Sequence, residues 1–116
     1  MAFPGTYNFN YYRGDTNEFV VRPKNSDGSA YDLAAYVGSA SYTVANKRGT
    51  GATQISAQAV VSGTTDIITC TILPATGRNL TAGTYVYDVQ IVDGPDKVFT
   101  LLTGTITVTD DITGAV

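Results

Sequence analysis

Few side chains in this chain can carry out chemistry, and their types exclude most catalytic sites. Cys70 is the single cysteine and histidine is absent, which excludes Ser-His-Asp and Cys-His catalysis, histidine zinc sites and imidazole pH switches. Ile68 and Ile72 lie two positions on either side of Cys70 and share its parity. This pattern indicates that Cys70 is a small buried hydrophobe rather than a nucleophile, and it has no partner for an internal disulfide.

Carboxylates are the other candidates for chemistry. Paired carboxylates that hydrolyse glycosides need one member in an apolar pocket, but every acidic residue here falls in a turn, in the tail or at an outward strand position. We therefore expect no enzyme. Four aspartates would gather around Ca²⁺ if the last turn and the tail lay at one end of the fold. These are Asp93, Asp96, Asp110 and Asp111. A solvated turn and tail is the favoured interpretation, so we expect no metal and no other cofactor.

Two short motifs resemble binding signals but are typical of turns. Arg13-Gly14-Asp15 matches an integrin-recognition tripeptide. A turn between two strands accounts for it, because Gly14 supplies a positive φ and Asp15 caps the turn. Asp27-Gly28 likewise indicates a tight turn. We expect Asp15 and Gly28 to have structural roles only.

Composition and charge exclude further classes of partner. Nine Asp and one Glu face three Lys and four Arg, which gives a net charge of -3 with 15% charged residues. This mild acidity argues against binding to nucleic acid or to an anionic membrane, because both require clustered basic residues. No run reaches the roughly 18 apolar residues of a membrane span, and the first residues lack the features of a signal peptide. We expect a soluble protein that is made and folded in the cytoplasm.

The elements that position these residues are predicted to be strands. The chain holds 18 Thr, 12 Val and 7 Ile, and β-branched residues favour pleated strands. Polar and apolar residues alternate from residue 6 to residue 109, with turn residues at intervals of roughly 8 to 15 positions. This predicts one all-β domain over 1–116, an Ig-like antiparallel β-sandwich of seven to eight strands with at most one helical turn near 74–79. Its core spans about 6–109, between terminal arms at 1–5 and 110–116.

Parity assigns the tyrosines to the core or to the surface. The expected strands are 6–12, 16–22, 38–46, 53–61, 66–73, 84–92 and 97–109. Their inward positions include five tyrosines, which are Tyr7, Tyr11, Tyr42, Tyr85 and Tyr87. Three others are left as candidates for surface contacts, which are Tyr12, Tyr31 and Tyr36. In strand 66–73, Thr69 and Thr71 are expected to face water.

The last strand carries apolar residues on both parities. Val98, Leu102, Ile106 and Val108 share one parity, which leaves two large residues on the other. Either a bulge near 101–102 rotates the register, or Phe99 and Leu101 form an apolar patch on the outer face. In the second case these two residues are candidates for contacts with another protein.

The segment from Leu80 to Tyr87 resembles the tyrosine corner of Ig domains. In that motif the first tyrosine hydrogen-bonds back to the backbone, and the residue two positions later enters the core. Tyr85 and Tyr87 match these positions after Gly83. Tyr87 stands where antibody domains place a cysteine, which is consistent with the lack of a partner for Cys70.

The chain also resembles the Ig-like modules of tailed-phage virion proteins, especially the N-terminal module of upper baseplate proteins. Four segments carry the resemblance in order and spacing over nearly the whole chain. They are Tyr12-Arg13-Gly14-Asp15-Thr16, Asp27-Gly28 with Tyr31-Asp32-Leu33, Leu80 to Val89, and Leu102-Thr103-Gly104-Thr105-Ile106-Thr107-Val108. Baseplate members continue into a longer region that carries receptor-binding parts, so the resemblance implies the docking module alone.

That resemblance, together with the missing catalytic residues, implies a non-enzymatic structural protein of the virion. We expect it to dock in multiple copies onto other virion proteins of the baseplate, neck or tail. Two alternatives stay open. One is a capsid decoration (cement) protein. The other is an Ig-like module that binds a glycan or protein of the host surface through its loops and through Tyr12, Tyr31 or Tyr36.

Overall fold

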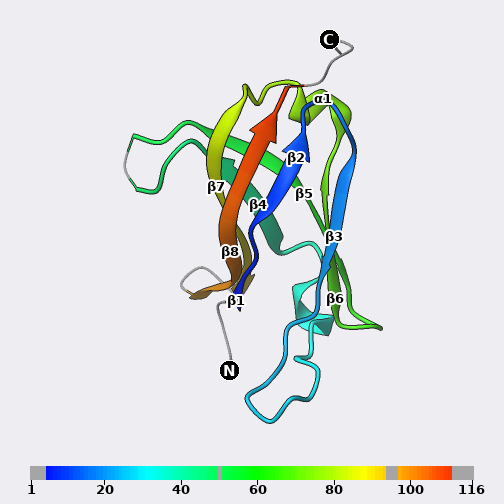
Figure 1. The fold of residues 1–116 in the computed structure, drawn as a ribbon. Helices are drawn as coiled ribbons and strands as arrows, with labels where there is room; N and C mark the ends of the chain where they lie inside the picture. Colours follow the sequence, from blue (N-terminus) through cyan, green and yellow to red (C-terminus); the bar gives the residue numbers. More distant parts are fainter. Residues whose placement is uncertain (1–4, 50, 94–96, 111–116) are drawn as a thin grey trace.

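The computed structural model describes residues 5–49, 51–93 and 97–110, without the side chains of Asp93 and Lys97. Eight strands dominate it (Figure 1). They are β1 (Gly5–Thr6), β2 (Phe9–Tyr12), β3 (Asn17–Val21), β4 (Ala40–Ala45), β5 (Gln54–Ser62), β6 (Ile67–Ile72), β7 (Gly83–Asp93) and β8 (Lys97–Thr109). Within the described residues, no helix is long and apolar enough to cross a membrane.

The strands form a curled, open sheet in the order β1-β8-β7-β4-β5-β6-β3, and β2 also pairs with β8. The pairings of β1 and β2 with β8 are parallel, and the others are antiparallel. β5 pairs with β4 through residues 54–57 and with β6 through residues 58–62. The sheet therefore bends in the middle of β5, which brings β3 round towards β2 (Figure 1). β1 and β3 are its two edges.

The core fills the inside of this curl. Phe9 of β2 and Phe19 of β3 have ring centroids 5.6 Å apart, so side chains from the two ends of the sheet meet. Tyr87 packs edge-on against both rings. The inward residues predicted for 38–46 and 66–73 are buried as expected, which are Tyr42, Val44, Ile68, Cys70 and Ile72. The mostly-β prediction is thus confirmed.

A β-bulge in β8 determines which of its apolar residues face the core. Val89 pairs with Leu102 while its neighbour Gln90 pairs with Thr100, so Leu101 has no opposite residue. The extra residue rotates the strand. Leu101 is buried at 3% exposure and Phe99 is half-buried, whereas Val98 is 53% exposed. Of the two alternatives the bulge is present, and the predicted inward position of Val98 is wrong.

The first strand is broken, where the sequence predicted one continuous strand over 6–12. Residues 7 and 8 separate β1 from β2. The chain crosses so close to β8 there that a Cβ at Gly104 would overlap the Tyr7 carbonyl oxygen. Asn8 Oδ1 accepts a hydrogen bond from the Thr105 N–H at 2.9 Å. Tyr7 is 46% exposed, so its assignment to the buried core was wrong. Its ring still stacks on that of Phe9, with centroids 5.4 Å apart.

Three further predictions need correction. The expected helical turn near 74–79 is present as α1 (Pro74–Gly77), but a 3₁₀ turn, η1 (Ala34–Tyr36), lies outside that region. Tyr36 packs into the core from this turn and is 8% exposed, so it is not a surface residue. Thr71 is buried as well, because β3 pairs with β6 and places Glu18 directly opposite it; the Glu18 carboxylate accepts a hydrogen bond from the Thr71 hydroxyl at 3.3 Å.

Candidate functional site

A hollow lies between the two edges of the curled sheet. We call it the β1/β3 groove; its volume is about 560 Å³. It is lined by Gly5, Tyr7, Phe19, Val20, Val21, Arg22, Pro23, Lys24, Leu101 and Leu102. These residues come from β1 and the link that follows it, from β3 and its continuation, and from the bulge of β8. Because the sheet curls without closing, the groove is the opening of the curl.

The floor of the groove is apolar. The rings of Tyr7 and Phe19 meet edge-on with centroids 5.5 Å apart and bridge the two edges. Leu101 and Leu102 lie beside them on β8. The bulge turns Leu101 inward, and Tyr7, which is 46% exposed, lies between the core and solvent.

The walls of the groove are strand edges. β1 pairs with β8 and β3 pairs with β6, and neither has a second strand partner among the described residues. In an edge strand, alternate backbone N–H and C=O groups point away from the sheet and are able to pair with another strand. The groove therefore offers both an apolar floor and backbone hydrogen-bonding groups.

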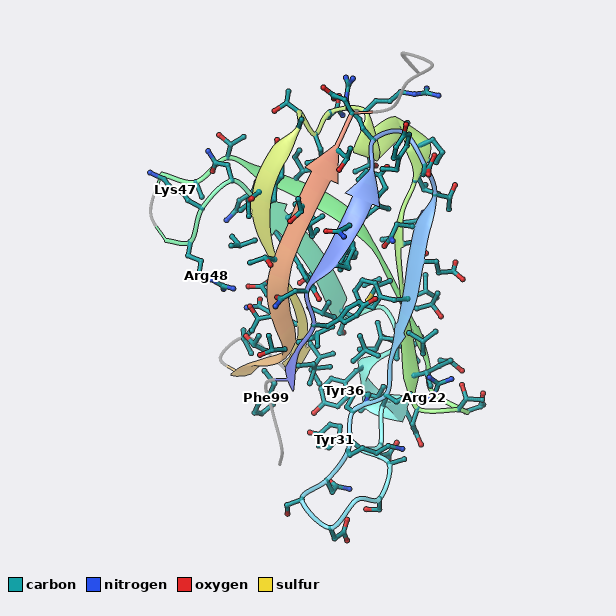
Figure 2. All side chains as sticks on the ribbon, in the orientation of Figure 1. Arg22, Tyr31, Tyr36, Lys47, Arg48 and Phe99 are labelled. Carbon is teal, nitrogen blue, oxygen red and sulfur yellow. The ribbon has the colours of Figure 1, made fainter. Side chains whose placement is uncertain are left out.

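One end of the groove carries positive charge. Arg22 and Lys24 flank Pro23 where β3 ends, and both are exposed. Pro23 has no backbone N–H, so it stops the ladder of β3. Its carbonyl accepts a hydrogen bond from the Tyr31 N–H at 3.0 Å, which turns the chain into the following loop. Figure 2 shows Arg22 at this end of the molecule.

The predicted contact residues do not form one surface. The rings of Tyr31 and Tyr36 contact each other in a tilted arrangement, with centroids 6.2 Å apart and hydroxyl oxygens 3.4 Å apart. Figure 2 shows this pair and Phe99 at the same end of the molecule as Arg22. Tyr12 is 40% exposed but ends β2 at the other end. Because Leu101 is buried and Phe99 is half-buried, the two do not make an exposed patch.

Two of the four candidate aspartates are described, Asp93 by its backbone alone, and they lie at opposite ends of β8. Asp110 follows the last residue of that strand, whereas Asp93 pairs with its first residue, Lys97. With 13 residues in β8, these two ends lie roughly 40 Å apart at about 3.3 Å per residue. Asp96, Asp111 and the side chain of Asp93 lie outside the described residues. Among the residues that are described, no cluster of three or more Cys, Asp or Glu side chains is suited to a metal ion.

The Arg13-Gly14-Asp15 motif is a turn, as predicted. Gly14 has a φ of 88°, and the Asp15 N–H donates to the Tyr12 carbonyl at 3.0 Å. The Arg13 side chain is part of the fold, because it donates to the Arg78 carbonyl at 2.9 Å and lies 3.9 Å from the Asp110 carboxylate. The Asp27-Gly28 turn is similar, with a φ of 89° at Gly28.

The tyrosine-corner residues take their predicted places. The Tyr85 hydroxyl accepts a hydrogen bond from the Thr81 N–H at 3.0 Å, and Gly83 between them has a φ of 148°. Two residues later, Tyr87 is 2% exposed. Its hydroxyl donates to the Tyr7 carbonyl at 2.5 Å, which links the corner to the groove.

Buried ionisable groups in the core are held neutral. Burial raises the pKa of the Cys70 thiol to about 12, so the thiol is protonated at neutral pH. A thiol is a poor nucleophile in this state. Burial also raises the pKa values of Tyr42 and Tyr87, with smaller contributions from neighbouring phenols and from Cys70. Cys70 is thus a small hydrophobic residue of the core, as its parity predicted.

A second, smaller hollow of about 200 Å³ lies beneath the β4–β5 turn. Arg48 reaches across it and donates to the Thr103 hydroxyl at 2.8 Å. Burial raises the pKa of Asp88 on its wall, and the Arg48 charge partly offsets this. The existing hydrogen bond occupies the Arg48 side chain, so this hollow is a weaker candidate than the groove.

Sequence analysis did not single out Val20, Arg22 or Lys24 as contact residues, although all three line the groove. Arg22-Pro23-Lys24 directly follows an alternating strand, and that pattern is a usable signal for a charged strand end. Val20 is 36% exposed on the same strand. Tyr7 had no such signal, because it shares the parity of Phe9 and of the buried Tyr11.

No protein-family model and no curated protein sequence matches the chain significantly. Two similar solved structures are an internalin-like protein of Listeria monocytogenes and a family 123 glycoside hydrolase of Clostridium perfringens. The first is 12% identical over 93% of this chain and 28% of its own, with a TM-score of 0.47. The second is 16% identical over 92% and 23%, with a TM-score of 0.39. The chain thus spans well under half the length of either, and neither similarity bears on function.

Proposed function

We propose that this chain is a non-enzymatic docking module, an Ig-like β-sandwich that serves as a structural protein of a phage virion in multiple copies. The observation that carries the docking role is the β1/β3 groove. It combines an apolar floor with two strand edges that have no further strand partner among the described residues. Proteins usually cover or blunt such edges, so a groove of this kind suits a partner.

The strand pairings support the Ig-like assignment. Ig domains place strands A, B, E and D in one sheet and C, F and G in the other. β3, β6 and β5 pair in the order B-E-D, and β4, β7 and β8 pair in the order C-F-G. The hydrogen bond from the Thr81 N–H to the Tyr85 hydroxyl matches the tyrosine corner of that fold.

The shape of the groove favours an extended segment as its occupant. A strand that enters a sheet edge gains main-chain hydrogen bonds, and pockets for its alternate side chains provide specificity. Tyr7, Phe19 and Leu102 form such an apolar strip here. Docking by strand addition needs no catalytic residue, which agrees with the neutral, buried Cys70.

The virion assignment rests on the sequence resemblance to phage Ig-like modules. Mass spectrometry of purified phage particles that encode this chain tests it, and we expect the chain in the particles at a fixed, repeated copy number. A copy number that matches one symmetric ring supports a baseplate, neck or tail position, whereas one that matches the capsid lattice supports decoration. Absence of the chain from purified particles overturns the virion assignment.

A further inference from the structure

We propose that the β1/β3 groove binds residues 110–116 of a second copy of this chain, which joins copies head to tail. The inference deepens the proposed function because it names the occupant of the groove. It also extends the docking role to contacts between identical subunits. These contacts can be measured with the purified chain in the absence of virions.

Charge complementarity between the groove and residues 110–116 favours this segment as the occupant. Residues 110–116 read Asp110-Asp111-Ile112-Thr113-Gly114-Ala115-Val116, with two acidic residues followed by no further charge. The groove has the opposite order, because Arg22 and Lys24 lie at one end and the apolar floor continues from them. With its acidic end beside Lys24, the segment would run antiparallel to β3.

The length and the alternation of the segment also fit. Seven extended residues span roughly 23 Å, and residues 19–24, which line the groove on the β3 side, span roughly 20 Å, at about 3.3 Å per residue. Ile112 and Val116 share one parity along the segment. Added to the edge of β3, the segment would direct both side chains to the same face, where Phe19 and Leu102 form the floor.

The geometry of β8 favours a second copy over the same copy. The segment follows Thr109, which pairs with Tyr12, whereas the groove lies beside Leu102. Seven residues of β8 separate these points, roughly 23 Å. To reach its own groove, the segment would have to reverse direction at Asp110 and run back along β8. β2 already occupies the position beside this part of β8.

A head-to-tail contact has consequences for assembly. The donor and acceptor surfaces are different, so the contact is heterologous and each added copy presents a new groove. Such contacts produce either closed rings or open filaments. Both arrangements place the chain in multiple copies, as the proposed function requires.

Sedimentation velocity of the purified chain over a wide concentration range tests the proposal. We expect the full chain to form dimers and longer oligomers as concentration rises, and a variant without residues 111–116 to stay monomeric. Lys24→Glu should weaken association about tenfold through charge repulsion. Lys47→Glu is the matched control, because Lys47 is exposed on the β4–β5 turn (Figure 2), and it should associate like the unmodified chain.

A charge swap and a peptide make the test specific. Asp111→Lys combined with Lys24→Glu should restore association, because it exchanges the two charges of one contact. A synthetic peptide of residues 110–116 should bind the shortened chain with one site per copy, and Lys24→Glu should weaken that binding.

Two results overturn the proposal. One is a full chain that stays monomeric and a peptide that does not bind. The other is association that persists without residues 111–116, which assigns the groove to another segment or partner. Neither result requires virions. If the purified chain forms oligomers through residues 110–116 but is absent from particles, the virion assignment is refuted and the proposal for the groove stands.

Discussion

The Tyr87 hydroxyl donates a hydrogen bond of 2.5 Å to the Tyr7 carbonyl, between residues 80 positions apart in the chain. This bond joins the middle of β7 to the break between β1 and β2. The Tyr7 ring, which is 46% exposed, forms part of the floor of the β1/β3 groove. A buried phenol in the core therefore anchors the backbone of one floor residue of the candidate docking site.

Tyr87→Phe should destabilise the fold and Tyr42→Phe should not. Both residues are buried, but the Tyr42 hydroxyl has no hydrogen-bond partner among the described residues. Removal of the Tyr87 hydroxyl leaves the Tyr7 carbonyl without its donor, which costs about 1–3 kcal/mol. Chemical denaturation of the two variants measures the difference. Equal stabilities would mean that the hydrogen bond to Tyr7 does not contribute.

Gly104→Ala should be among the most destabilising single substitutions in the chain. A Cβ at this position overlaps the Tyr7 backbone, which cannot move without breaking the link between β1 and β2. Overpacking of this kind costs about 1–3 kcal/mol or more. Gly5→Ala is a suitable control, because its Cβ would meet Leu102 Cδ1 at an ordinary 3.6 Å. A thermal melt in which both variants match the unmodified chain would refute the close crossing.

Cys70 should resist modification in the folded protein. Its thiol is buried and its pKa is raised to about 12, so a thiol reagent at neutral pH should label it only after unfolding. The pKa of a cysteine in the unfolded chain lies near 9. The unfolded state therefore loses its proton first as pH rises, and this group makes stability fall between about pH 9 and pH 12. Rapid labelling under native conditions would contradict the buried position.

Alkaline unfolding should shift to higher pH in Tyr42→Phe. Burial is the main reason that the pKa of Tyr42 is raised, and the negative charges that Cys70 and Tyr87 would carry add to it. The unfolded phenol ionises near pH 10, so ionisation favours the unfolded state as pH rises. Circular dichroism against pH measures the midpoint. An unchanged midpoint would show that another group controls alkaline unfolding.

The sequence predicted the strands better than the site. Alternation placed the last strand at 97–109, which is also the extent of β8, and it placed Cys70 and Tyr87 in the core. These positions depend on period two, which a local pattern records directly. The tyrosine corner was predictable for the same reason, because its hydrogen bond joins residues only four positions apart.

The groove was not predictable, because it depends on contacts between distant segments. Tyr7 had the parity of a core residue, and only the approach of Gly104 shows why the strand breaks there. The burial of Tyr36 depends on a 3₁₀ turn without a strong sequence signal. The bulge at Leu101 was one of two open alternatives, since both parities of that strand carry large apolar residues.

Incorporation of paired groove variants into particles tests the central claim most directly. Val20 and Val60 pair with opposite sides of Thr69 and are both exposed, but only Val20 lines the groove. Val20→Asp or Val60→Asp would be co-expressed with the unmodified chain during infection, and mass spectrometry of purified particles would count each form. We predict that Val60→Asp enters particles like the unmodified chain and that Val20→Asp is depleted about tenfold. Equal incorporation of Val20→Asp and the unmodified chain would contradict docking through the β1/β3 groove.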